Sequence, residues 1–322
     1  ILEIGEVREL ILRKIVKMHR CPNIVFNLLM DLDNNTLADV LIGGLTYSEW
    51  DRIRRGLEWR NVGDDSFLIP PIPNLYFTRD IGAIVQDGII CTKMFYDVRA
   101  REALLMQYIF TYHPLFKNTP ILYGEGEEDT PYTIEGGDVV VVNESVIAIG
   151  CGERTKHHTI EQVAKNLFEK TSIERIYEVR MPPARAYMHL DKIFAIVDED
   201  VVVVYPEVLE QKAETIVYKK RRTPSGVSFN RERIRASFLK ALREELGSLT
   251  QVPTGGGDLT VARREQWANG TNTLAIRPGV VIAYDCNKKT NQALREVLGE
   301  KNVIEIPSSE LVKGGGGPRC IS

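Results

Sequence analysis

A cysteine near the chain end follows a run of four glycines, and together they suggest chemistry. The glycines are residues 314–317, and Cys320 is the third-last residue. Glycine has no Cβ, so a glycine run lets the backbone pass close to other groups. The segment therefore indicates either a frayed tail or a loop that delivers a nucleophilic thiol to a ligand.

Polar residues recur upstream, just before apolar segments that read as first strands of β-hairpins. The expected hairpins span 82–92, 138–149, 193–204 and 273–283, and helical patterns at 98–108, 159–170, 231–246 and 290–298 lie between them. Repetition of a hairpin and a helix favours modules placed around an axis, as in a propeller. The alternative is an ordinary α+β domain in which the hairpins recur by coincidence.

If the modules are pseudo-symmetric, the residues that precede their first strands point at one centre. These residues are Asp80, Glu135, Asp138, His189 and Asp191. His189 and Asp191 are two apart, so on a strand both side chains would face the same way. We expect Cys320 to meet this cluster.

Several carboxylates at one centre are costly to bury without a cationic partner. The sequence offers no obvious internal cation at these positions, so we expect the ligand to supply the charge. A guanidinium fits, because it is planar, stays protonated and offers five donors. The alternatives are that each residue is a turn or surface group, or that Glu135, Asp138, His189 and Asp191 bind a metal. A metal site would leave Cys320 unexplained.

A thiolate beside a bound guanidinium can attack its central carbon. His189 would serve as acid and then as base, because its ordinary pKa is near neutrality. Glu135 would share that work or orient His189, and Asp80 and Asp191 would clamp the guanidinium nitrogens. This chemistry requires no metal and no cofactor.

Composition limits the remaining possibilities. The chain has 322 residues, a net charge of −3 and a pI near 6.1, which argue against a nucleic-acid partner. No apolar stretch is long enough to span a membrane. Five scattered cysteines fit free thiols in a reducing, cytoplasmic compartment. Helical periodicity fills roughly the first 60 residues, and a proline-rich entry follows. We therefore expect a helical domain over 1–62 and a second domain over 63–322.

Five segments in register resemble the arginine deiminase family. They are PNLYFTRD at 73–80, IEGGD at 134–138, GERT at 152–155, MHLD at 188–191 and the segment 314–322. The resemblance implies hydrolysis of L-arginine to L-citrulline and ammonia through a covalent cysteine thiouronium intermediate, by a homo-oligomer. It also implies an α/β fold, the pseudo-symmetric five-bladed propeller called a pentein, with an inserted or N-terminal helical domain.

The resemblance also implies a role for each site residue. Cys320 falls on the nucleophile, His189 and Glu135 on the acid/base pair, and Asp80 and Asp191 on the guanidinium-binding carboxylates. Asn74, Arg99 and Arg154 fall on the positions that hold the substrate carboxylate, Phe77 on a pocket wall, and Asp138 on support for the substrate amino end or for His189.

The sequence departs from the family pattern at its start. Four blades are recognisable where the family has five, so we expect that the first blade is missing and that residues 1–60 align with the helical domain. Residues 3–7 alternatively resemble the family's opening strand. Two other functions therefore stay open: an amidinotransferase of the same fold, and a relative whose catalysis is impaired.

Overall fold

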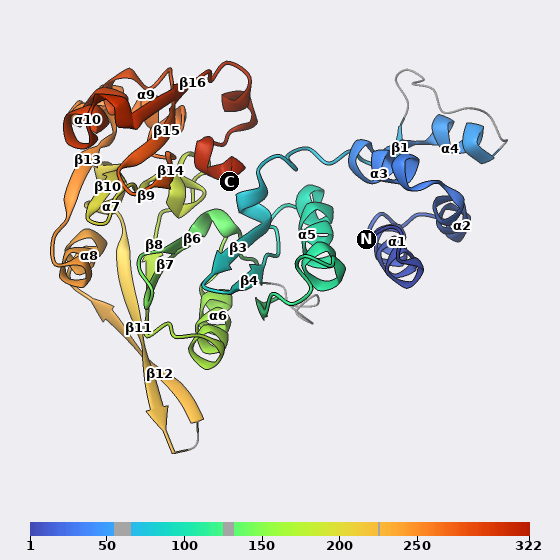
Figure 1. Ribbon diagram of the computed structural model, residues 1–322, viewed down its shortest axis with the longest axis horizontal. Coiled ribbons are helices and arrows are strands. Elements are labelled where there is room, and N and C mark those ends of the chain that lie inside the picture. The colour runs from blue at the N-terminus through green and yellow to red at the C-terminus, as the bar shows by residue number, and fades with distance from the viewer. Residues whose placement is uncertain (55–65, 125–131, 225) are drawn as a thin grey trace. The chain divides into compact units, whose positions relative to one another are not determined.

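The computed structural model describes residues 1–54, 66–124, 132–224 and 226–322, and it divides into two compact units (Figure 1). The helical unit comprises Ile1–Leu75 and Tyr96–Thr119, and the sheet unit comprises Tyr76–Phe95 and Pro120–Ser322. The predicted domain boundary between residues 62 and 63 lies outside the described residues.

The helical unit is built from short amphipathic helices around one apolar core. Its elements are α1 (Gly5–Met18), α2 (Asn23–Asp31), α3 (Asn34–Gly43), α4 (Tyr47–Arg54), α5 (Ala100–Tyr112) and the antiparallel strands β1 (Leu45–Thr46) and β2 (Phe67–Ile69). Helix α5 was expected to belong to the second domain, yet Leu104 and Tyr108 on one face of it pack into the core of the helical unit. The spacing of four residues between its apolar positions indicates a helix, but it does not indicate which core the helix packs against.

The sheet unit repeats one module. In each module an antiparallel hairpin is followed by a crossover to a third strand that pairs parallel with the second. The strands are β3 (Gly82–Val85), β4 (Gly88–Cys91) and β5 (Ile121–Tyr123); β6 (Val139–Val141), β7 (Val146–Cys151) and β8 (Arg175–Arg180); β9 (Phe194–Ile196), β10 (Val201–Val204) and β13 (Thr250–Pro253); and β14 (Leu274–Arg277), β15 (Val280–Tyr284) and β16 (Val303–Ile306). The four predicted hairpins are confirmed. The third strand of each module, which pairs parallel with the second, was not predicted.

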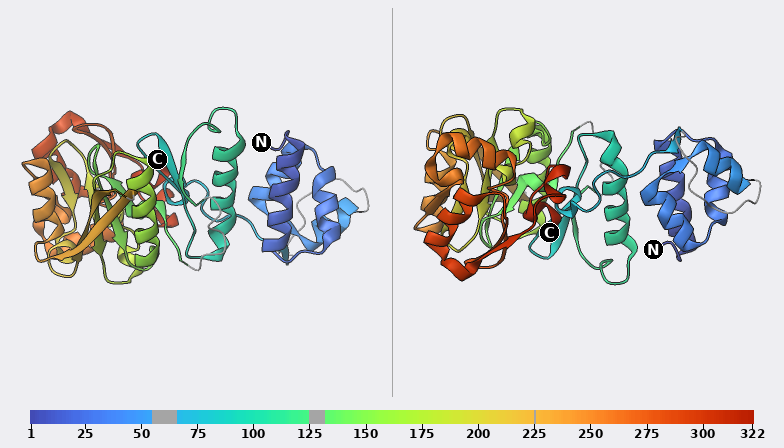
Figure 2. Two further views of the ribbon diagram at one scale, coloured as in Figure 1. Left: turned by 90° about the horizontal axis from the view of Figure 1, so that it is seen from below. Right: turned by 90° about the horizontal axis from the view of Figure 1, so that it is seen from above.

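Helices on the outside of the sheet unit cover its sheets. They are α6 (His157–Lys170), α7 (Pro206–Leu209), α8 (Phe238–Leu246), α9 (Leu259–Trp267) and α10 (Lys288–Leu298). Figures 1 and 2 show α6, α8 and α10 along the periphery of the unit. Alternate residues of β7 enter two cores: Ile147 and Ile149 pack with α6, whereas Ala148 packs in the cluster that contains α8. Burial on both faces fixes the register of the strand.

A long hairpin widens the second sheet. Strand β11 (Glu214–Thr223) pairs with β8, and β12 (Gly226–Ile234) pairs with β11, so that the hairpin extends away from the unit in Figure 1. The helix predicted over 231–246 is wrong in its first part, because β12 continues to Ile234. The helix α8 begins only after Ser237, whose hydroxyl accepts a hydrogen bond from the Lys240 amide as an N-cap.

In the described part of the chain, no helix has both the length and the apolar character that crossing a bilayer requires.

Candidate active site

Tight 3-10 turns place the predicted carboxylates. The turns Thr78–Ile81, Gly136–Asp138 and Leu190–Lys192 come just before the first strands of three modules, with at most one residue between. Asp80, Asp138 and Asp191 occupy these turns. His189 precedes the turn that contains Asp191, so the alternation of side chains along a strand does not place these two residues. The site is nevertheless assembled from equivalent points of the repeated module.

His189 and Glu135 form a buried pair. The His189 Nε2 atom lies 2.7 Å from the Glu135 Oε2 atom, and both side chains are almost completely buried. Burial alone would raise the pKa of Glu135, but the hydrogen bond from His189, the charges of His189 and Arg154 and the Phe95 amide lower it to about 2. Glu135 is therefore a carboxylate at neutral pH, and it orients the imidazole.

Asp80 lies on the other side of the same ring, with its Oδ1 atom 3.6 Å from the His189 Nδ1 atom. Burial alone would lower the pKa of His189, but Asp80, Glu135 and Asp138 together raise it to about 10. In the free site the imidazole is consequently protonated at neutral pH and can donate a proton.

Asp138 is a fully buried carboxyl that holds the turn in place. Its Oδ1 atom accepts a hydrogen bond of 2.8 Å from the Leu190 amide, which lies between His189 and Asp191. Burial raises the pKa of Asp138 to about 7. This contact favours support of the His189 segment over direct contact with a ligand.

Cys320 and Asp191 face each other. The Cys320 Sγ atom lies 3.9 Å from the Asp191 Oδ2 atom, and the thiol is buried. Burial, together with Asp191 and Asp80, raises the pKa of the Cys320 thiol well above its ordinary value. Within the described residues, the buried Asp191 Oδ1 atom has no hydrogen-bond donor. A buried carboxylate oxygen of this kind calls for a cationic donor beside the sulfur.

The glycine loop, residues 314–320, is docked rather than frayed. The Gly316 carbonyl accepts a hydrogen bond of 3.1 Å from the Tyr284 hydroxyl, and the Ile321 carbonyl accepts one of 3.1 Å from the Thr78 hydroxyl. A Cβ atom at Gly316 would lie 2.5 Å from the ring of the buried Phe77. The glycine is thus required for close approach to a protein side chain, and Phe77, predicted as a pocket wall, supports the loop.

Two residues that sequence reasoning missed hold this loop. The Lys192 Nζ atom donates to the Asn269 Oδ1 atom at 2.5 Å and to the Gly315 carbonyl at 2.9 Å, and its side chain is buried. The Asn272 Oδ1 atom accepts from the Cys320 amide at 3.2 Å. The expectation that the sequence offers no obvious internal cation at these positions is therefore wrong for the third module, where Lys192 supplies one. Lysine is rarely fully buried, so an isolated Lys192 in the sequence gave no signal.

Arg154 belongs to the buried cluster and is not a surface charge. Its guanidinium lies 3.4 Å from the Glu135 Oε2 atom and contacts the Met188 sulfur at 3.3 Å. Without the resemblance, an arginine at this position reads as an ordinary exposed residue. Its position shows that it acts on the charge of Glu135.

Asn74 and Arg99 lie in the helical unit, where they form a cluster of their own. The buried Arg99 guanidinium binds the Glu102 Oε2 atom at 2.8 Å and donates to the Asn74 carbonyl at 3.3 Å. The Glu102 Oε1 atom in turn accepts from the Asn74 amide at 3.3 Å. Both predicted residues are held in a defined geometry by Glu102.

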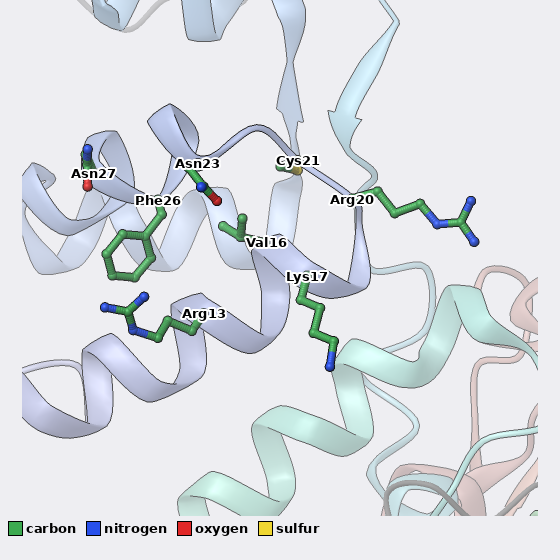
Figure 3. Close-up of a pocket in the computed structure, with 8 residues that line it drawn as sticks. All are labelled: Arg13, Val16, Lys17, Arg20, Cys21, Asn23, Phe26 and Asn27. Carbon is green, nitrogen blue, oxygen red and sulfur yellow. The ribbon is translucent and has the colours of Figure 1, made fainter.

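A cavity of about 630 Å³ in the helical unit contains none of the predicted site residues (Figure 3). It lies at the junction of α1 and α2, and its lining residues include Arg13, Lys17, Arg20 and Phe26. In the described ranges, no three His, Cys, Asp or Glu side chains are arranged to hold a metal ion. The candidate site is accordingly the cluster around Cys320.

Comparison with solved structures identifies the class of fold. The N-terminal domain of ArgZ, a cyanobacterial arginine dihydrolase solved with its product, aligns with a TM-score of 0.54 at 15% identity over 86% of this chain and 84% of that one. DDAH from Pseudomonas aeruginosa in complex with citrulline aligns with a TM-score of 0.54 at 18% identity over 87% and 93%. The chain therefore has the mixed α/β fold of these enzymes.

Sequence comparison identifies the family. The arginine deiminase family model matches residues 8–322. An arginine deiminase of Bacillus cereus is 41% identical over 300 residues, which cover 91% of this chain and 72% of that protein. One of Listeria monocytogenes serotype 4a is 37% identical over 323 residues, covering 98% and 77%. The chain belongs to the arginine deiminase family.

Proposed function

We propose that this protein is an arginine deiminase that hydrolyses L-arginine to L-citrulline and ammonia, with Cys320 as nucleophile. The observation that carries the proposal is the buried Asp191 carboxylate beside the Cys320 sulfur, with one oxygen that has no donor among the described residues. A guanidinium bound there supplies the missing donors and places its carbon near the sulfur.

The first half of the reaction forms the covalent intermediate. The guanidinium cation bound by Asp80 and Asp191 favours loss of the thiol proton to solvent, because a positive charge stabilises the thiolate. The thiolate adds to the guanidinium carbon and gives a tetrahedral adduct. Protonated His189 then donates its proton to one nitrogen, which leaves as ammonia and leaves a thiouronium on Cys320.

The second half releases the product. His189 is now neutral and takes a proton from a water molecule that adds to the thiouronium carbon. The carbon–sulfur bond breaks, the proton of the added hydroxyl passes to the departing sulfur, and the carbonyl of citrulline and the free Cys320 thiol form. Glu135 stabilises the imidazolium through its 2.7 Å contact, and the proton that His189 gives up to the leaving ammonia is recovered from the attacking water.

The remaining predicted residues keep their roles as proposals. Arg154 holds the substrate carboxylate, because an arginine guanidinium binds carboxylates bidentately. The same role stays a prediction for Asn74 and Arg99. Phe77 forms a pocket wall by supporting the glycine loop, and Asp138 supports His189. Arg154 additionally keeps Glu135 ionised.

Product analysis tests the proposal directly. The protein should produce citrulline and ammonia from arginine in equal amounts without an amine acceptor, whereas an amidinotransferase would require one. Cys320→Ala should abolish turnover and leave arginine binding measurable by calorimetry. The matched control is Cys286→Ala, because Cys286 is an exposed free thiol. Turnover by Cys320→Ala near that of the control would refute the nucleophile assignment.

The finer description of the fold is also a proposal. We infer a five-bladed propeller whose first blade lies outside this sequence. A helical domain over 1–62 and a catalytic domain over 63–322 stay the proposed division, from which the segment 96–119 departs because it belongs to the helical unit. The repeated ββαβ module and the greater length of the Bacillus relative support the propeller. Addition of native upstream residues should raise turnover and thermal stability, and no gain in either would contradict it. Homo-oligomerisation and a cytoplasmic location stay predictions.

A further inference from the structure

We propose that Lys192 is a positioning residue for the nucleophile, whose buried ammonium holds the glycine loop and provides a fixed positive charge for the Cys320 thiolate. The inference rests on the proposed function, in which Cys320 attacks the substrate. It assigns a role to a side chain that neither the predicted site nor the proposed reaction uses.

Lys192 connects three parts of the site. It lies in the turn Leu190–Lys192 directly after Asp191, and its Nζ atom binds Asn269 Oδ1 at 2.5 Å and the Gly315 carbonyl at 2.9 Å. Asn269 precedes the first strand of the fourth module and is itself 1% exposed, with a left-handed φ of 62°. One ammonium thus joins the third module, the fourth module and the glycine loop.

Burial of this ammonium demands compensation. Lys192 is 4% exposed, and an unpaired charge at such a position is strongly unfavourable. Burial lowers its pKa, while Cys320, Asp191 and Asp80 act against that shift. Both carbonyl contacts are neutral, so the compensating negative charge comes from the Asp191 and Asp80 carboxylates, and from Cys320 once its thiol has ionised. The ammonium is therefore electrostatically coupled to the nucleophile.

The coupling acts in both directions. The titratable groups that act on the Cys320 thiol come from several elements: Asp80, Asp191, Lys192, Arg319 and Tyr284. Asp191 and Asp80 disfavour the thiolate, whereas Lys192 favours it. Without Lys192 the two carboxylates would act on the sulfur with less opposition, and a smaller fraction of the thiol would ionise at a given pH.

A purely structural clamp is the competing explanation, and Tyr284 allows the two to be separated. Tyr284 donates a hydrogen bond to the next loop carbonyl, that of Gly316, at 3.1 Å. Tyr284→Phe removes one bond to the loop without changing the charge. Lys192→Gln keeps a donor group for the loop but removes the charge. Lys192→Arg keeps the charge.

The test is alkylation of Cys320 in the full chain without arginine. Iodoacetamide reacts with the thiolate, so the rate at a pH below the thiol pKa reports the ionised fraction. The rate is followed by mass spectrometry on the peptide that contains Cys320, with the exposed Cys286 as internal standard. We expect Lys192→Gln to slow alkylation of Cys320 at least tenfold, and Lys192→Arg to stay within threefold of the wild type.

Tyr284→Phe should not reproduce the loss seen in Lys192→Gln. Equal alkylation of Cys320 in Lys192→Gln and wild type would overturn the inference, and so would a loss of equal size in Tyr284→Phe. If Lys192→Gln fails to fold, Lys192→Met takes its place, because Met has a similar length and no charge. In turnover, Lys192→Gln should lower kcat at least tenfold and change KM less.

The outcome is separable from that of the proposed function. Absence of citrulline from the wild-type protein would refute the proposed function, whereas the alkylation rates do not require turnover. Normal citrulline formation together with unchanged alkylation in Lys192→Gln would refute only the role of Lys192.

Discussion

At the scale of residues, the charge state of His189 follows from its three carboxylate neighbours. Its pKa is raised from 6.5 to about 10. The stabilisation that this shift represents is fully present below pH 6.5 and is lost as the pH rises through about 10. The shift of Glu135 from 4.5 to about 2 has the opposite sign, because its contribution is present above pH 4.5 and is lost as the pH falls through about 2.

We therefore predict that His189→Asn is most harmful to stability at mildly acidic pH. The difference in free energy of unfolding between wild type and variant should be largest near pH 6 and should shrink toward pH 10, since neutral His189 no longer benefits from the carboxylates. Chemical denaturation at about pH 6, 8 and 10 measures it. A difference that stays constant over this range would contradict the assignment of a protonated His189.

Arg154 should affect arginine and agmatine differently. Agmatine lacks the α-carboxylate, so loss of a carboxylate-binding arginine should not weaken its binding. Arg154→Ala should raise KM for arginine by about tenfold or more, the effect of losing one charge-assisted pair. It should also lower kcat on both substrates, because Arg154 contacts Glu135.

Steady-state kinetics of the wild type and of Arg154→Ala, each on arginine and on agmatine, provide the measurement. Arg263→Ala is the control, since Arg263 is an exposed arginine paired with Glu207 on the surface of the same unit. Equal wild-type efficiency on arginine and agmatine would argue against a carboxylate-binding role for Arg154.

The sequence patterns located residues that lie beside a repeated hairpin motif. They missed residues that reach the site only through contacts between distant parts of the chain. Asp80, His189 and Asp191 could be placed because each precedes a hairpin. Arg99 and Arg154 came only from the resemblance, because nothing local distinguishes a buried arginine from an exposed one. Lys192 and its contact with Gly315 span 123 residues of sequence, and no local pattern encodes such a contact.

At the scale of elements, the glycine loop depends on space as well as on flexibility. A Cβ atom at Gly316 would lie 2.5 Å from the Phe77 ring, closer than real contacts allow. Phe77 is 3% exposed and cannot move easily. We predict that Gly316→Ala displaces the loop and lowers kcat at least tenfold, because small displacements of catalytic groups cost about two orders of magnitude.

The control and the rescue follow from the same geometry. At Gly152 an added Cβ atom would make ordinary contacts at 3.6 Å and beyond, so Gly152→Ala should retain kcat. Truncation of Phe77 creates room for the added Cβ atom. The double variant Gly316→Ala/Phe77→Ala should therefore lose less kcat than the losses of the two single variants combined. If the effects of the two substitutions on kcat are strictly additive in free energy, positions 316 and 77 are not coupled.

The hairpins were predictable because each combines two β-branched runs with a short polar turn. The third strands were not, because Thr250–Pro253 and Ile121–Tyr123 are short and find their register only by pairing with β10 and β4. The 3-10 turns that carry the carboxylates were also missed. Such turns of three or four residues have no periodicity that a sequence can display.

At the scale of the whole molecule, the chain leaves the sheet unit and returns to it. Residues 96–119, which separate β4 from β5, belong to the helical unit. No single boundary in the sequence can describe this arrangement. Proline and glycine signals indicate where a chain turns, but the core that a helix joins depends on burial of its apolar face.

This assignment of α5 predicts which part of the molecule a core mutation weakens. Leu104 lies in α5 and packs in the same core as Ile11 and Leu12 of α1. Leu104→Ala should destabilise the helical unit by about 2–4 kcal/mol, as buried leucine truncations do. Leu115→Ala is the matched control, because Leu115 is 80% exposed in the same segment and its loss should cost under about 0.5 kcal/mol.

Hydrogen exchange localises the effect. If α5 is part of the core of the helical unit, Leu104→Ala should accelerate amide exchange in α1 and α3 while β4 and β5, the strands that the segment connects, keep their protection. Faster exchange confined to β4 and β5 would place α5 energetically with the sheet instead. The result decides whether the stability of the segment 96–119, which connects β4 to β5, is coupled to the helical unit or to the sheet unit.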